Sequence, residues 1–267
     1  MFKANSYTLD RDPHIATHPP RYVCLPEPTA TLRACMNKPL STLLILALLM
    51  LSALLHGSEP TPAGVAKWEK EWETYEALPA PQPGTIAAIG SSSLRMWKGI
   101  AEDLAPLPVW NRAFGGSKTA ELLPALPRLI LPHKPKVIIY YCGDNDLGSP
   151  TSDPTVPVEN FKRFVADLRK ELPKTRIVYL NIKPSGKRAA AWPVAQQANT
   201  AVAAWCASDP LIYLVDTAKP LLGADGKPDP ALFLKDDLHL NTEGYRRWTA
   251  LIKPVVEKAW AAAQQDG

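Results

Sequence analysis

Four short polar clusters contain the residue types that acyl transfer requires. They are Gly90-Ser91-Ser92-Ser93, Asn111–Ser117, Gly143-Asp144-Asn145-Asp146 and Asp236-Asp237-Leu238-His239. Acyl transfer needs a nucleophile, a base that activates it, a carboxylate that orients the base, and hydrogen-bond donors aimed at the developing oxyanion. The serine, histidine, aspartate, asparagine and glycine of these clusters can supply every part. Together they indicate a hydrolase with a serine nucleophile.

His239 is the strongest single indication, because His133 is the only other histidine beyond residue 57. Asp236 lies shortly before it and can accept a hydrogen bond from one imidazole nitrogen, which leaves the other nitrogen free to take a serine proton. Among the three serines we favour Ser92, since the triplet lies between a predicted strand and a predicted helix. Each residue also has a purely structural interpretation, because serines fill turns and cap helices, and acidic residues favour the first turn of a helix.

Asn145 and Gly116 are the candidate donors to an oxyanion. The side-chain amide of Asn145 can donate, and the missing side chain of Gly116 lets a substrate oxygen approach its backbone N–H. Alternatively, Asn145 shapes a turn and Gly116 only supplies a positive φ. The catalytic interpretation is favoured because the clusters are expected to meet at one edge of the same sheet.

The elements that would position these clusters alternate along the chain. Strands are predicted at residues 85–89, 109–110, 137–141, 177–180 and 212–215, and helices at 65–78, 94–100, 119–131, 161–172, 190–206 and from Tyr245 onward. Strands alternating with helices favour a parallel sheet covered on both faces, whose ligands bind at the carboxyl ends of the strands. We therefore expect a linker and an N-terminal helix at 58–84, followed at 85–267 by an α/β domain with three layers, α/β/α, and a central parallel sheet of about five strands.

The ordered motifs IGSSSLRMW, NRAFGGS, GDNDL and DDLHLNTEGY resemble those of the SGNH hydrolase superfamily, also called GDSL-type lipases and esterases. The resemblance covers the chain from about Ile86 to the last helix. The chain departs from the family at Ser91, where the family name has aspartate. This Gly-Ser-Ser-Ser form resembles a branch near the platelet-activating-factor acetylhydrolase-like members.

The resemblance implies a flavodoxin-like fold and a set of roles for the residues singled out above. Ser92 would be the nucleophile, His239 the base and Asp236 its partner. The oxyanion hole would be formed by Gly116, Asn145 and the backbone N–H of Ser92. Family members cleave esters of lipids, acetylated sugars or small acyl groups without a metal, so we expect no cofactor and a small-molecule, glycan or lipid ester as substrate.

The N-terminal region carries a different pattern. Lys38 precedes an uncharged apolar run at residues 40–55, which is short for a membrane span and is typical of a secretory signal. We interpret residues 36–57 as a signal peptide or an N-terminal anchor that associates with the membrane, with translation beginning at Met36. Residues 1–35 would then lie outside the native protein or be disordered. Either interpretation predicts export to the periplasm, the cell envelope or the medium.

Composition limits the remaining function classes. The formal net charge of +4 is small and dispersed, so no nucleic-acid partner is expected. Cys142 and Cys206 are the only cysteines beyond residue 57, and we expect free, buried thiols, although a bridge between them stays open. Two rival functions remain: a non-catalytic envelope binding module on the same fold, and a metal-dependent phosphoesterase. The latter would use the ligand set Asp144, Asp146, Asp236 and His239. The sequence leaves the oligomeric state open.

Overall fold

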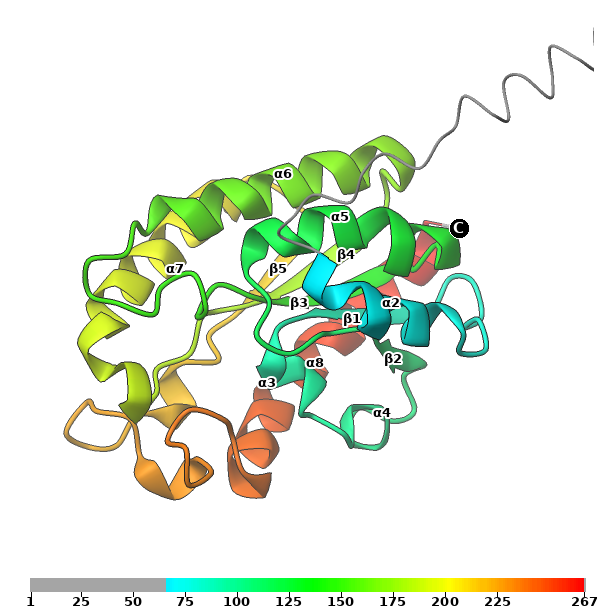
Figure 1. Ribbon diagram of the computed structural model, residues 1–267. Coiled ribbons are helices and arrows are strands. Elements are labelled where there is room, and N and C mark those ends of the chain that lie inside the picture. Colours follow the sequence, from blue (N-terminus) through cyan, green and yellow to red (C-terminus); the bar gives the residue numbers. More distant parts are fainter. Residues whose placement is uncertain (1–65, 267) are drawn as a thin grey trace, which may run out of the picture. The chain divides into compact units, whose positions relative to one another are not determined.

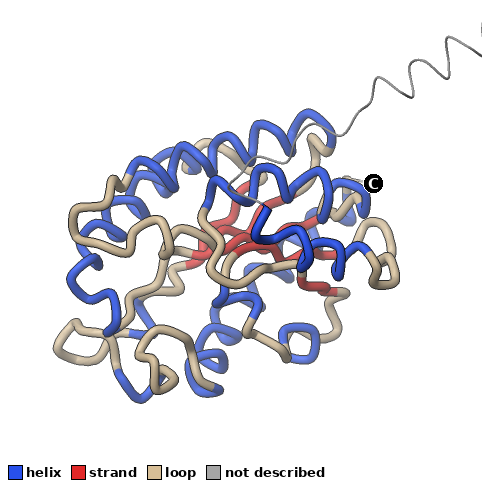
Figure 2. The backbone as a smooth tube through the Cα atoms, viewed as in Figure 1, coloured by secondary structure: helices blue, strands red, loops and turns tan. Residues whose placement is uncertain are grey.

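The computed structural model describes residues 66–266, which form a layer of helices on each face of one parallel sheet (Figure 2). The sheet has five strands in the order β2-β1-β3-β4-β5. Their bounds are Ile86–Gly90 for β1, Val109–Asn111 for β2, Val137–Tyr141 for β3, Arg176–Leu180 for β4 and Ile212–Val215 for β5. All four strand pairs are parallel. The three-layer fold and the five-stranded parallel sheet predicted from the sequence are confirmed.

Helices connect the strands and cover the two faces (Figure 1). The α-helices are α2 (Glu69–Glu76), α3 (Ser92–Arg95), α4 (Ile100–Asp103), α5 (Thr119–Leu129), α6 (Thr155–Glu171), α7 (Trp192–Cys206) and α8 (Thr242–Gln265). Short 3-10 helices are η1 (Ala66–Trp68), η2 (Leu131–His133), η3 (Gly186–Ala191), η4 (Lys219–Leu221) and η5 (Pro230–Leu232). Buried side chains of α2, α5, α6 and α7 pack on one face of the sheet, and those around α3, α4 and α8 pack on the other.

The central strands are mainly apolar, as expected of strands covered on both faces, although β4 begins with Arg176. Every residue of β1, β3 and β4 is buried, whereas the edge strands β2 and β5 are partly exposed. Cys142 and Cys206 are free and buried, as expected. None of the helices in the described range is long and apolar enough to cross a membrane. The predictions for residues 1–35, 36–57 and the start of 58–84 lie outside the described residues.

Candidate active site

Ser92 is held at the carboxyl edge of the sheet by the turn from β1 into α3. It is the first residue of α3, and its side chain is partly exposed, whereas Ser91 and Ser93 are buried. Gly90 makes the turn possible, because a Cβ at this position would lie 1.8 Å from the backbone oxygen of Tyr141. Only glycine lets the end of β1 approach β3 this closely, so the residue before the serine triplet is fixed by backbone packing.

Three polar side chains form a continuous hydrogen-bonded chain with Ser92 at one end. The hydroxyl oxygen of Ser92 lies 2.9 Å from Nε2 of His239, and Nδ1 of His239 lies 2.6 Å from Oδ2 of Asp236. A carboxylate only accepts hydrogen bonds, so Nδ1 carries the proton and Nε2 is left to accept the proton of the serine hydroxyl. The structure therefore brings Ser92, His239 and Asp236 together, with the imidazole between the hydroxyl and the carboxylate.

Asp236 is kept ionised by its neighbours. Partial burial works against the charge, but hydrogen bonds from the His239 ring and from the backbone N–H groups of His239 and Leu238 outweigh it and lower the pKa of Asp236 to about 2. A carboxylate in this state orients the ring and stabilises the imidazolium that forms when the ring takes up a proton.

The loop that carries His239 is anchored at both ends. The backbone N–H of Leu234 donates to the His239 carbonyl at 2.8 Å, and the side chain of Asn241 caps α8 by accepting from the N–H of Gly244 at 3.1 Å. Between these points, Asp237 has a φ of 54°, which turns the chain sharply before His239. The histidine thus precedes a capped helix and is held on a short, tied loop.

Gly116 lies on the loop that extends β2 along the end of β1. The carbonyl of Gly90 accepts from the N–H of Phe114 at 3.0 Å and from the hydroxyl of Ser117 at 3.2 Å. Gly116 itself has a φ of 78° and is exposed. Asn111 ties this loop to α3, because its side chain donates to the Leu94 carbonyl at 2.7 Å.

Asn145 lies on the turn that follows β3, and its amide has polar partners on both sides. Its Nδ2 donates to the Ser117 carbonyl at 3.0 Å, and its Oδ1 accepts from Arg188 at 2.7 Å. The neighbouring Asp146 accepts from the hydroxyl and the N–H of Thr119, at 2.7 Å and 3.0 Å, and so joins the turn to the start of α5. Burial raises the pKa of Asp146, against the opposing effect of these hydrogen bonds.

The proposed metal ligands are engaged in different contacts. Asp144 faces the cations Lys183 and Arg188, Asp146 binds Thr119, and Asp236 binds His239. Within residues 66–266, no group of three or more His, Cys, Asp or Glu side chains converges as a metal site would require. The phosphoesterase hypothesis therefore has no assembled ligand set in this part of the chain.

The predicted N-terminal helix, which occupies Glu69–Glu76, contacts the loop of Gly116 in a way that the sequence did not indicate. Trp68 packs edge-on against Phe114, with ring centroids 5.1 Å apart, and Trp72 does so at 5.4 Å. The hydroxyl of Tyr75 donates to the Ala113 carbonyl at 2.6 Å. The sequence predicts a helix here, but it does not identify the loop against which that helix packs.

The loop at residues 183–188 is buried from Lys183 to Ser185, whereas Lys187 is exposed. The side chain of Lys183 is fully buried, with its Nζ 3.7 Å from Oδ2 of Asp144, and it donates to the Leu238 carbonyl at 2.7 Å. Burial lowers the pKa of Lys183, with Asp144 acting in the opposite direction. Lysine is typical of exposed loops, so only the tertiary contacts reveal that Lys183 is buried.

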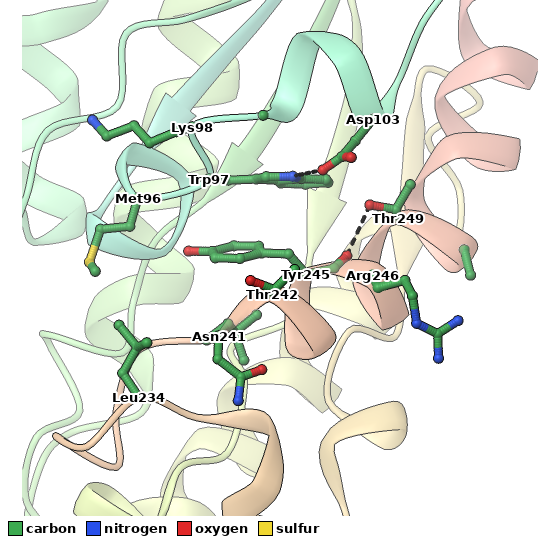
Figure 3. A pocket seen from close by; sticks show the side chains of 13 residues that line it. Met96, Trp97, Lys98, Asp103, Leu234, Asn241, Thr242, Tyr245, Arg246 and Thr249 are labelled. Carbon is green, nitrogen blue, oxygen red and sulfur yellow. Dashed lines mark hydrogen bonds between the residues drawn. The ribbon is translucent and has the colours of Figure 1, made fainter.

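A pocket of about 740 Å³ borders the site between α3, α4 and α8 (Figure 3). Its lining includes Met96, which is one helical turn after Ser92, and Leu240, which follows His239. The Trp97 ring stacks over that of Tyr245 with centroids 5.6 Å apart, and the Tyr245 hydroxyl donates to the Ser93 carbonyl at 2.8 Å. Ser92, His239 and Asp236 are not among the residues that line this pocket.

Comparison with known proteins identifies the family. The model of the GDSL-like lipase/acylhydrolase family matches residues 85–247. No match was found among curated proteins.

Solved structures share the fold. A GDSL-like lipase from Bacteroides thetaiotaomicron has a TM-score of 0.61 and 19% identity, over 71% of this chain and 97% of that one. A protein from Streptococcus pneumonia provisionally assigned as a platelet activating factor has a TM-score of 0.57 and 19% identity, over 83% and 98%. A carbohydrate esterase family 3 protein from Talaromyces cellulolyticus has a TM-score of 0.54 and 13% identity, over 67% and 99%. At these identities the structures show the fold alone. The family match spans more than half of the sequence, and the chain accordingly belongs to the GDSL-like lipase/acylhydrolase family of ester-bond hydrolases.

Proposed function

We propose that the protein is a serine esterase that cleaves carboxylic esters through an acyl-enzyme. The observation that carries this proposal is the continuous contact from the Ser92 hydroxyl to Nε2 of His239, and from Nδ1 to the Asp236 carboxylate. Such a chain lets a neutral imidazole take the serine proton while the carboxylate stabilises the resulting cation.

The reaction has two halves. In the first, His239 takes the proton of Ser92 as the serine oxygen bonds to the ester carbon, and the carbonyl electrons move to the oxygen. The N–H groups of Ser92 and Gly116 and the amide of Asn145 stabilise this oxyanion. As the carbonyl re-forms, the alcohol leaves with the proton from His239. In the second half, water gives a proton to His239, attacks the acyl-enzyme and releases the acid, and Ser92 recovers its proton.

We propose an ester of a lipid, an acetylated sugar or a small acyl group as substrate. The pocket described above would receive the larger part of such a molecule. Exposed Leu234 and partly exposed Met96 offer apolar surface there, and Lys98 adds positive charge (Figure 3). The guanidinium group of Arg246 is paired with Glu243. The name of the structural neighbour from Talaromyces cellulolyticus, a carbohydrate esterase, supports inclusion of acylated sugars.

The serine triplet provides its own matched controls for this proposal. Ser92→Ala should remove nearly all hydrolysis of a short-chain nitrophenyl ester, because the nucleophile is lost. Ser91→Ala and Ser93→Ala remove the same hydroxyl group from the two flanking, buried positions and should keep most of the activity. An active Ser92→Ala enzyme would contradict the proposal, and an inactive Ser91→Ala enzyme would place the nucleophile one residue earlier.

We also propose that the domain is exported, on the basis of the signal-like pattern at residues 36–57. The protein should then be recovered from the envelope or the medium, and a cleaved form should begin after about Gly57. N-terminal sequencing of the native protein tests this. Recovery of a cytoplasmic protein that begins at Met1 would contradict both the start site and the export.

A further inference from the structure

Arg188 contacts the turn of Asn145 from the loop that follows β4. One guanidinium nitrogen, Nη2, donates to Oδ1 of Asn145 at 2.7 Å. The other, Nη1, donates to the Asp144 carbonyl oxygen and lies 3.4 Å from the Asp144 carboxylate. The side chain of Arg188 is 20% exposed, and that of Asp144 is 6% exposed. A forked group in a mostly buried setting thus holds two consecutive residues of this turn.

The two partners of Asn145 determine which way its amide faces. A guanidinium group can only donate, so Arg188 requires the oxygen of the amide on its side. The Ser117 carbonyl can only accept, so it requires the nitrogen, which lies 3.0 Å away. The nitrogen carries two hydrogens, and Ser117 is its one acceptor among residues 66–266. The second hydrogen is left for a substrate oxygen.

If the Asn145 amide were flipped, its interaction with the oxyanion would change from attractive to repulsive. With Oδ1 toward the substrate, Asn145 would present a partial negative charge to a developing oxyanion and would raise the barrier instead of lowering it. Donors in such sites act through their fixed orientation. The contact with Arg188 therefore matters for catalysis if Asn145 is a donor.

The Asp144 carboxylate contacts two cations, Arg188 and Lys183. The carboxylate lies between the two cations, at 3.4 Å from Arg188 and 3.7 Å from Lys183, and Lys183 donates to the Leu238 carbonyl beside His239. The network fixes the guanidinium group relative to both the Asn145 turn and the His239 loop. The bidentate shape of arginine suits this task, whereas lysine offers a single point of contact.

We propose that Arg188 is a positioning residue, which keeps the Asn145 amide turned with its N–H toward the oxyanion. The proposal rests on the proposed function, in which Asn145 is an oxyanion donor. It predicts an effect of Arg188 on turnover that is exerted through Asn145 alone.

A double-mutant cycle on 4-nitrophenyl acetate hydrolysis tests this. Arg188→Met should lower kcat by about 10- to 100-fold with little change in KM, because the donor is misplaced but present. Asn145→Ala should lower kcat by about 10²–10³, and adding Arg188→Met to it should cause no further loss. Lys187→Met removes a cation from the next, exposed position and should leave kcat unchanged. Circular dichroism of each variant gives the folded fraction to which kcat is referred.

The outcomes separate the two levels of the proposal. The role of Arg188 is overturned if Arg188→Met keeps the wild-type kcat. It is also overturned if Arg188→Met lowers kcat by the same factor in the Asn145→Ala background as in the wild type. Wild-type kcat in Asn145→Ala overturns the oxyanion role of Asn145 itself. If Arg188→Met does not fold, Arg188→Lys enters the same cycle, because it keeps the charge beside Asp144 and loses the fork. If the losses of kcat caused by Arg188→Lys and by Asn145→Ala multiply in the double variant, the proposal is likewise overturned.

Discussion

Gly186→Ala should distort the His239 loop from a position outside the reacting groups. Gly186 begins η3 and packs directly on Asp237, the residue after Asp236. A Cβ at residue 186 would lie 1.8 Å from Oδ2, 2.4 Å from Cγ and 2.6 Å from Oδ1 of Asp237. Ordinary contact begins at 3.4 Å, so the carboxylate must move by at least 3.4 − 1.8 = 1.6 Å.

The expected loss follows from that displacement. The backbone of the loop has few ways to yield, because the Asp237 carbonyl accepts from the Lys187 N–H at 2.9 Å and the residue already has a positive φ. The atoms that clash belong to the Asp237 side chain, whose rotation relieves part of the contact. A misplacement of about 1 Å in a catalytic group costs on the order of 10²-fold in rate, or about 2.7 kcal/mol. Because rotation of the Asp237 side chain takes up part of the clash, we expect kcat to fall by up to that factor, with a loss of unfolding free energy of about 1–3 kcal/mol from overpacking.

Steady-state kinetics and urea unfolding of Gly186→Ala test this prediction. Two further variants serve as controls. Gly148→Ala is the matched control, since its Cβ would meet none of the described atoms within 4 Å, and it should be silent. Gly186→Ala combined with Asp237→Gly removes the clashing carboxylate and should recover most of the kcat of Asp237→Gly alone. Wild-type kcat in Gly186→Ala, or no recovery in the combined variant, would refute the reasoning.

Three further predictions concern Asp236 and Tyr75. Asp236, with a pKa of about 2, stays ionised at all pH values well above 2, so its ionisation should not appear in the pH profile of kcat/KM near neutral pH, and a carboxylate ionisation there would contradict this. The stability that this carboxylate contributes should be present above the ordinary pKa of an aspartate and disappear as the pH falls toward 2. Tyr75→Phe should lower the unfolding free energy by about 1 kcal/mol and also lower kcat, because its hydroxyl holds the Ala113 carbonyl near Gly116. Unchanged kcat in Tyr75→Phe would make α2 a purely structural element.

The fold could be predicted because its main determinants are local in sequence. Runs such as Val137–Tyr141 are wholly apolar and short, which is typical of strands covered on both faces. The polar residues directly after such strands meet at one edge of a parallel sheet, so the sequence was enough to nominate Ser92 and Asn145. The scarcity of histidine beyond residue 57 was enough to nominate His239.

The supporting contacts could not be predicted because they depend on partners far away in the sequence. Lys183 is buried against Asp144 and Leu238, and neither its charge nor its neighbours in the chain indicate that. Arg188 reaches Asn145 from a different crossover connection. Local patterns report which residues are apolar or reactive, and the packing of loops decides which charges lie beneath the site.

The most direct test of the central claim is to label the intact protein with a fluorophosphonate probe and map the modified peptide. An activated serine attacks the phosphorus, so the account predicts a single adduct on Ser92 and none in His239→Ala, where the base is missing. A label on Ser91, Ser93 or another residue, or equal labelling of His239→Ala, would contradict the account.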